Sequence, residues 1–119
     1  MNMKTMGWMG LAVLLAVGTG CFRNSSSTIE LKIPAMKTEV CGQLVQVAIA
    51  RLGVGDETAA VHEIRVDVAA RTVWVTYNNV RLGRRNIEVV VRHAGFAVND
   101  LPADEEVRAK LDPECRGDE

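Results

Sequence analysis

The stretch HEIRVDVAARTVWVTYNN, residues 62–79, constrains the fold more than any other part of this sequence. It contains two runs in which apolar and polar residues alternate, joined by residues 69–71. Alternation with a period of two indicates a strand with one buried face, and two such runs joined by a short turn predict a β-hairpin. The side chains expected to face inward are Ile64, Val66, Val68, Val73, Val75 and Tyr77.

The segments around this hairpin alternate between the strand period and the helix period. Alternating apolar residues predict a strand over residues 28–33, which ends at Pro34. Apolar residues at 3.6-residue spacing predict helices over residues 41–53 and 83–94, and FAVNDL predicts a short last strand. The order strand, helix, strand, strand, helix, strand predicts an α+β fold, a ferredoxin-like βαββαβ sandwich with two helices on one face of an antiparallel sheet.

The sequence after the last predicted strand indicates an additional C-terminal helix. Pro102 and the acidic residues that follow it are typical of a first helical turn. The hairpin pattern leaves Trp74 on the sheet face that the two main helices do not cover. A large exposed apolar side chain needs cover, which we expect from the C-terminal helix through Val107 and Leu111, or else from a partner protein.

The first twenty residues are predicted to be an export signal rather than part of the fold. They carry Lys4 near the start, an apolar core over residues 11–17 and then small residues. This core is shorter than the roughly 20 residues that span a bilayer. The stretch VGTGC resembles the lipobox of bacterial lipoproteins, which implies lipidation of Cys21. The alternative is ordinary secretion with cleavage after Gly18 or Gly20.

These boundaries divide the chain into a signal peptide over residues 1–20, a lipid-anchored polar linker over 21–27, a domain over 28–101 and a tail over 102–119. The predicted location is the bacterial cell envelope, an oxidising compartment in which a disulfide persists. The net charge is −1 with both signs interspersed, so there is no electrostatic footprint for nucleic acid. No nucleophile–base pair or carboxylate dyad stands out, and we predict a binding protein rather than an enzyme.

Four segments of the chain resemble the heavy-metal-associated domain family. They are IPAM, the cysteine at position 41, VDVAARTVWVTYN and HAGFAV. The family's metal loop, Met-x-Cys-x-x-Cys, falls on Met36, Thr38 and Cys41, with a threonine in place of the first cysteine. The resemblance implies a site for Cu(I) or Hg(II), with Met36 packing under the loop more often than binding, and with Phe96 shielding the site. Threonine is a poor ligand for such ions, which prefer thiolate.

The tail offers a second thiol. In this topology the last strand runs away from the metal loop, and a helix of about 10 residues at roughly 1.5 Å each returns the chain by some 15 Å. Cys115 is therefore expected to reach Cys41, which lies at a helix N-terminus where the thiolate form is favoured. If Cys21 carries lipid, these two thiols are the remaining pair.

Two outcomes stay open for Cys41 and Cys115. A reduced pair forms a two-coordinate soft-metal site, in which a four-coordinate zinc ion would lack ligands. An oxidised pair forms a disulfide that stabilises the fold by roughly 4 kcal/mol on the chain-entropy model, and the chain is then an interaction domain without metal. Thiol–disulfide exchange is a third and weaker possibility, because no resolving cysteine lies near Cys41 in the sequence.

The remaining candidates are expected at the surface. His62 is predicted at the end of the sheet away from Cys41, and His93 near the end of the second helix, on the side of the metal loop. The basic cluster Arg81, Arg84 and Arg85 is expected to be a solvated helix start, or else a docking site for an acidic partner. The predicted partners are a metal ion and an envelope metal transporter or another envelope protein.

Overall fold

The computed structural model describes residues 25–56 and 58–117 of the chain. The predicted signal peptide and Cys21 lie outside these residues. The elements, in chain order, are β1 (Ser26–Lys32), α2 (Glu39–Ala50), β2 (Val61–Asp67), β3 (Thr72–Asn78), α3 (Arg84–His93), α4 (Glu105–Arg108) and a 3-10 helix η1 (Pro113–Cys115). No helix among the described residues has the length and apolar character that crossing a membrane requires.

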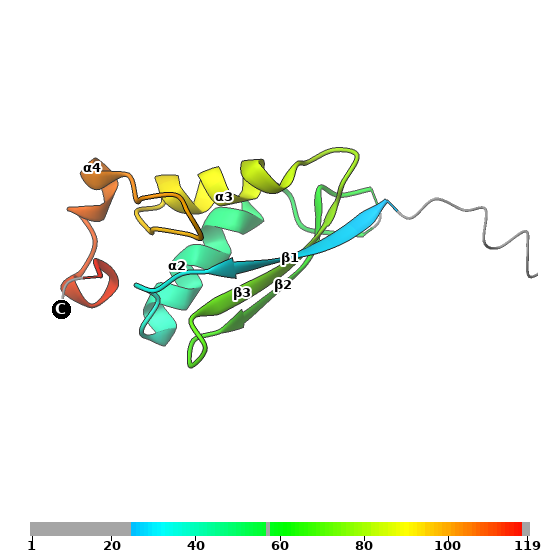
Figure 1. Cartoon of the computed structure of the whole chain (residues 1–119). Helices are drawn as coiled ribbons and strands as arrows, with labels where there is room; N and C mark the ends of the chain where they lie inside the picture. The colour runs from blue at the N-terminus through cyan, green and yellow to red at the C-terminus, as the bar shows by residue number, and fades with distance from the viewer. Residues whose placement is uncertain (1–24, 57, 118–119) are drawn as a thin grey trace, which may run out of the picture.

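The three strands form one antiparallel sheet with the order β1-β3-β2. Helices α2 and α3 lie on one face of this sheet, so the fold has two layers (Figure 1). Gly42 allows α2 to approach β2 closely, since a Cβ at this position would lie only 3.1 Å from side-chain atoms of Val66 and Val68. The fully buried side chains between the layers include Leu31, Ile33, Met36, Val45, Ile49, Val61, Val73, Val75, Ile87, Val91, Phe96 and Val98.

The hairpin has the predicted faces. Val73, Val75 and Tyr77 are buried, and Ile64 and Val66 pack against the core from β2. The first strand begins at Ser26, two residues before the predicted start. The helices agree with the 3.6-residue pattern, although α2 begins two residues earlier and ends three residues earlier than predicted.

The predicted fourth strand is wrong. Residues 98–101 form a tight turn, in which Val98 and Leu101 exchange backbone hydrogen bonds of 3.0 and 2.8 Å. Asn99 occupies the left-handed region at φ 52°, which asparagine tolerates better than most residues. The Asn99–Asp100 pair thus reverses the chain after it contacts β1 at a single residue, Lys32. There the Lys32 N–H donates to the Asn99 side-chain oxygen, and the Asn99 N–H donates to the Lys32 carbonyl.

The Asn99 side chain also completes a polar network around the buried carboxylate of Glu88. Its amide donates to Glu88 at 2.6 Å, and the same carboxylate pairs with Arg84 at 3.4 Å and Arg85 at 3.2 Å. Glu88 is 2% exposed, and a buried carboxylate is stable only when it is paired and hydrogen-bonded. The network therefore holds the turn against α3 at the place where a fourth strand was expected.

The predicted C-terminal helix is much shorter than expected, because α4 spans four residues and is followed by turns and η1. It does not cover Trp74, so that expectation is wrong. Val107 and Leu111 instead line a pocket with residues of α2 and α3. Trp74 is half-buried and is covered by the guanidinium of Arg65, 5.2 Å from the ring centre, a cation–π contact across neighbouring strands.

We predict that Asn99→Gly lowers the free energy of unfolding by about 2 kcal/mol, because it removes the hydrogen bonds of the side chain with the buried Glu88 carboxylate and with the Lys32 N–H, without straining the backbone. Asn99→Ala is expected to cost about 1 kcal/mol more, since alanine resists a positive φ. Urea unfolding followed by circular dichroism measures both. Asp100→Ala is the control, because the pair of Asp100 with Arg85 is exposed and worth little. A glycine variant as stable as the parent would contradict this role.

Candidate functional site

Thr38 and Cys41 lie at the N-terminus of α2. Thr38 is the N-cap residue, and its hydroxyl accepts a hydrogen bond of 3.3 Å from the backbone N–H of Cys41. Threonine is a favoured N-cap because its oxygen satisfies a backbone donor that the helix leaves free. The residue at the place of the family's first cysteine therefore starts the helix, and Cys41 is fully buried in the first turn.

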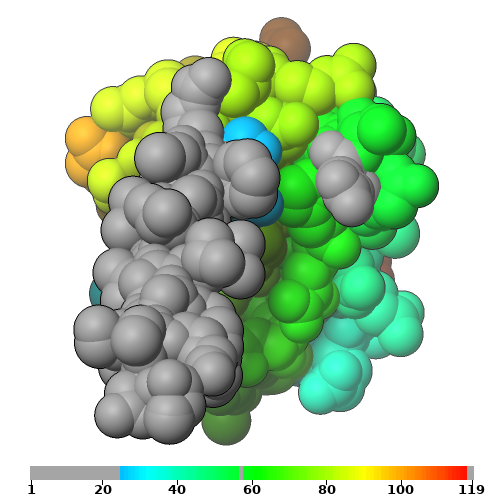
Figure 2. Space-filling view, turned by 90° about the vertical axis from the view of Figure 1, so that its right-hand side faces the viewer, coloured from blue at the N-terminus to red at the C-terminus, as the bar shows by residue number. Residues whose placement is uncertain are grey.

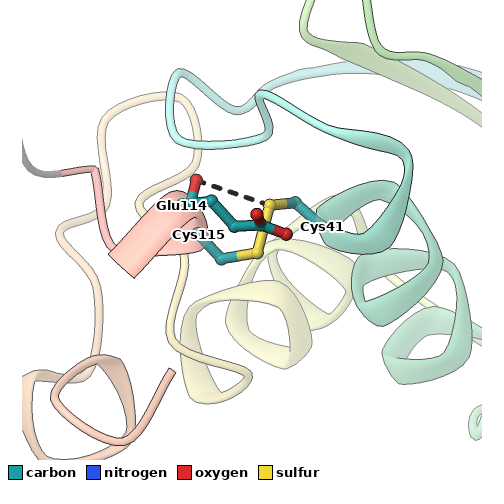
Figure 3. A group of neighbouring side chains, drawn as sticks. All are labelled: Cys41, Glu114 and Cys115. Atoms are coloured by element: carbon teal, nitrogen blue, oxygen red, sulfur yellow. Dashed lines mark hydrogen bonds between the residues drawn. A yellow bond between two sulfur atoms is a disulfide. The ribbon is translucent and has the colours of Figure 1, made fainter. Parts of the chain in front are cut away.

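The tail brings Cys115 to the same place. After α4 the chain turns back, and η1 sets Cys115 against the start of α2 (Figure 1). The two cysteines form a disulfide with an S–S distance of 2.15 Å and a Cα–Cα distance of 5.5 Å (Figure 3). Both cysteines are fully buried. The end of the body that faces away from this tail is seen in Figure 2.

Glu114 is a third polar group at the site, and the sequence did not predict it. Its carboxylate and the two sulfurs lie within 4.8 Å of one another, and the Thr38 hydroxyl donates to its Oε2 at 3.2 Å. The Glu114 carbonyl oxygen lies 3.5 Å from the Cys41 sulfur (Figure 3). A disulfide sulfur carries no hydrogen, so this contact becomes a hydrogen bond only when Cys41 is a thiol. The only sequence signal was that Glu114 immediately precedes Cys115.

Met36 and Phe96 belong to the core. Both are fully buried, and the Met36 sulfur packs against α2, 3.9 Å from the place of a Cβ on Gly42. The role of Met36 at a metal site stays a prediction. Shielding of the site by Phe96 stays a prediction.

The two histidines lie outside the group of Cys41, Glu114 and Cys115. His62 is half-buried and lies 3.2 Å from Ser26 at the start of β1, the end of the strand away from α2. His93 is exposed and pairs with Asp104 at 3.4 Å. In the basic cluster, Arg84 and Arg85 pair with Glu88 and Arg81 donates to the carbonyl of Thr58, so these guanidinium groups have partners within the fold.

The tail is packed against the end of α3 as well as bonded to α2. Gly95 adopts φ 102°, and a Cβ there would lie 2.8 Å from Leu111 and 3.2 Å from the backbone nitrogen of Arg108. Asp104 donates its backbone N–H to Arg92 and pairs with His93. The Arg108 guanidinium donates to the Arg116 carbonyl beside η1. These contacts fix the direction in which Cys115 approaches Cys41.

No protein-family model matches the sequence, and no curated protein matches it. Solved structures do match in fold. Oxidized MerP from Ralstonia metallidurans CH34 aligns at 20% identity and a TM-score of 0.55, over 62% of this chain and 94% of that protein. A copper binding domain from HMA7, a P-type ATPase, aligns at 17% identity and a TM-score of 0.53, over 60% and 89% of the two chains.

The N-terminal domain of PacS from Synechocystis PCC6803 aligns at 22% identity and a TM-score of 0.50, over 61% of this chain and 94% of that domain. At identities this low, the likeness concerns the fold alone. The described chain therefore has an α+β fold that resembles heavy-metal-associated domains, with three strands in its sheet.

We predict that reduction of the disulfide lowers the free energy of unfolding by about 4 kcal/mol. The bond joins residues 74 apart, so its loss restores a large loop-closure entropy to the unfolded chain. Chemical unfolding of the oxidised and reduced forms of a Cys21→Ser chain measures the difference. Cys115→Ala without reductant should match the reduced form, and equal stability of the oxidised and reduced forms would contradict the prediction.

The contact between Asp104 and His93 predicts a pH effect at the base of the tail. The hydrogen bond from His93 holds the pKa of Asp104 below its ordinary value of 3.8, and the backbone N–H of Glu106 acts in the same direction. Because the folded chain binds this proton less tightly than the unfolded chain, the stabilisation is present above pH 3.8 and is lost as pH falls through the lowered pKa. NMR titration of the carboxyl should show the low value.

The variant His93→Ala should raise the pKa of Asp104 toward its ordinary range. Asp56 is the matched control, because hydrogen bonds from Thr58 lower its pKa and do not involve His93. An Asp104 titration that His93→Ala leaves unchanged would argue against the contact.

Proposed function

We propose that the reduced chain binds one soft metal ion of the Cu(I) or Hg(II) class through Cys41 and Cys115. The observation that supports this proposal is the meeting of two cysteine sulfurs at the N-terminus of α2, although the chain has a threonine at the place of the first cysteine of the family's loop. Thiolates are the ligands that soft ions select. The partial positive charge at a helix N-terminus favours the thiolate form of Cys41.

The geometry of the disulfide is compatible with an inserted ion. Two metal–sulfur bonds of about 2.3 Å separate the sulfurs by up to about 4.6 Å, and Cα atoms 5.5 Å apart allow this separation after rotation of the side chains. Loading first requires a dithiol reductant, which supplies two electrons and two protons, is itself oxidised to a disulfide, and leaves Cys41 and Cys115 as thiols. The thiol protons are released when the metal binds.

The other residues of the predicted loop support the site without binding the ion. Thr38 starts the helix that carries Cys41, and Met36 packs beneath it. The ion would be cargo, carried rather than used for chemistry. With the predicted export signal and lipidation at Cys21, the chain would act at the envelope, in metal transport, homeostasis or resistance, with an envelope metal transporter as the partner.

The alternative function is a metal-free interaction domain that the Cys41–Cys115 disulfide stabilises. The observation that favours it is the outer edge of β1, where the tight turn pairs with Lys32 alone. Among the described residues, no strand continues this pairing along Thr28 and Glu30, and an open groove of about 920 Å³ separates β1 from α3 there. An open strand edge accepts an added strand from another protein.

Metal titration distinguishes the two functions. We expect the reduced Cys21→Ser chain to bind one Hg(II) or Cu(I) ion, seen by native mass spectrometry and by thiolate-to-metal absorbance. Cys41→Ser should abolish binding, because it removes the thiolate on the helix. Cys115→Ser should weaken it at least tenfold, since soft ions bind hydroxyl groups poorly.

The controls are the oxidised chain, which should not bind, and Met36→Leu, which keeps the core volume and removes the thioether. Met36→Leu should bind as the parent does. Binding that survives Cys41→Ser would rule out the proposed site, and a folded reduced chain without affinity for either ion would leave the interaction domain as the function.

A further inference from the structure

Glu114 changes the number of ligands that the site offers. Two thiolates alone satisfy an ion that prefers two ligands, and they leave zinc short of donors. The structure adds a carboxylate from the residue beside Cys115, with its oxygen and the two sulfurs all within 4.8 Å (Figure 3). Three protein donors and one open position form a complete set for a four-coordinate divalent ion.

The distances between these donors fit such an ion. Bonds of about 2.3 Å to sulfur and about 2.1 Å to a carboxylate oxygen, arranged tetrahedrally, place the donor atoms roughly 3.6–3.8 Å apart. The present separations reach 4.8 Å at most. Once the S–S bond is reduced, rotation of the three side chains brings the donors to these distances.

Thr38 positions the carboxylate. Its hydroxyl lies between the two halves of the site, 3.3 Å from the backbone nitrogen of Cys41 and 3.2 Å from Glu114 Oε2. A hydrogen bond to a ligating carboxylate fixes its direction and strengthens binding. The threonine at the place of the missing thiolate thus orients the oxygen donor from the tail.

The three donor residues differ in their exposure to solvent. Cys41 and Cys115 are fully buried, whereas Glu114 is exposed. Water therefore reaches the carboxylate side of the site, from which it would supply the fourth ligand of a divalent ion.

We propose that Glu114 is a third protein ligand and that the reduced site also takes a divalent ion of the Zn(II) or Cd(II) class, with water in the fourth position. This inference rests on the thiol pair of the proposed function. The two classes of metal would then require different ligands. Cu(I) and Hg(II) would use the two thiolates alone, and Zn(II) and Cd(II) would require the carboxylate as well.

The test is a pair of titrations on the reduced Cys21→Ser chain. Zn(II) affinity is measured by competition with a chromophoric chelator, and Hg(II) binding by thiolate-to-metal absorbance. Glu114→Gln should weaken Zn(II) binding at least tenfold and leave the Hg(II) stoichiometry unchanged. Glu106→Gln is the matched control, because it removes the same charge from an exposed residue of the tail, and it should change neither.

Thr38→Ala should weaken Zn(II) binding and Thr38→Ser should restore it, since serine keeps the hydroxyl. The results separate this inference from the proposed function. A chain that binds Hg(II), with Zn(II) affinity equal in the parent and in Glu114→Gln, overturns the role of Glu114 and leaves the thiol pair intact. A reduced, folded chain that binds neither ion overturns both.

Discussion

The disulfide between Cys41 and Cys115 is the constraint on which the C-terminal part of this structure depends. In its described part, residues 102–117, the tail has only a four-residue helix and a 3-10 turn of its own, too little regular structure to hold a position by itself. Its other attachments include the close contacts at Gly95, the contacts of Asp104 with Arg92 and His93, and the hydrogen bond between Thr38 and Glu114. A covalent bond to the first turn of α2 sets the position of η1, and with it the place of Glu114.

The tight turn at Asn99 determines where the tail begins. A fourth strand running along β1 would carry the chain to the end of the sheet away from α2, and a long helix would be needed to bring it back. The turn reverses the chain near Lys32, so the short path through α4 reaches Cys41. The same turn leaves the outer edge of β1 without a strand among the described residues. The turn at Asn99 therefore explains both the open outer edge of β1 and the meeting of Cys115 with Cys41.

The sequence predicted the parts of the fold that depend on periodicity. Val73, Val75 and Tyr77 face inward as the alternation requires, and α2 and α3 follow the 3.6-residue pattern. The prediction of a fourth strand was wrong because only the first three residues of FAVNDL have a strand composition. The turn preference of Asn99 and Asp100 outweighed them. The prediction of a long C-terminal helix was wrong because capping signals mark where a helix starts and do not say how far it continues.

The two cysteines of the site could be predicted from the sequence, whereas the oxygen atoms of Glu114 and Thr38 could not. Cysteine is rare enough for Cys115 to stand out in the sequence, whereas Glu114 is one of many acidic residues and is distinguished only by the direction in which η1 holds it. Thr38 looked like a lost ligand because position in a motif says nothing about hydrogen bonds. In the structure its hydroxyl caps α2 and contacts Glu114.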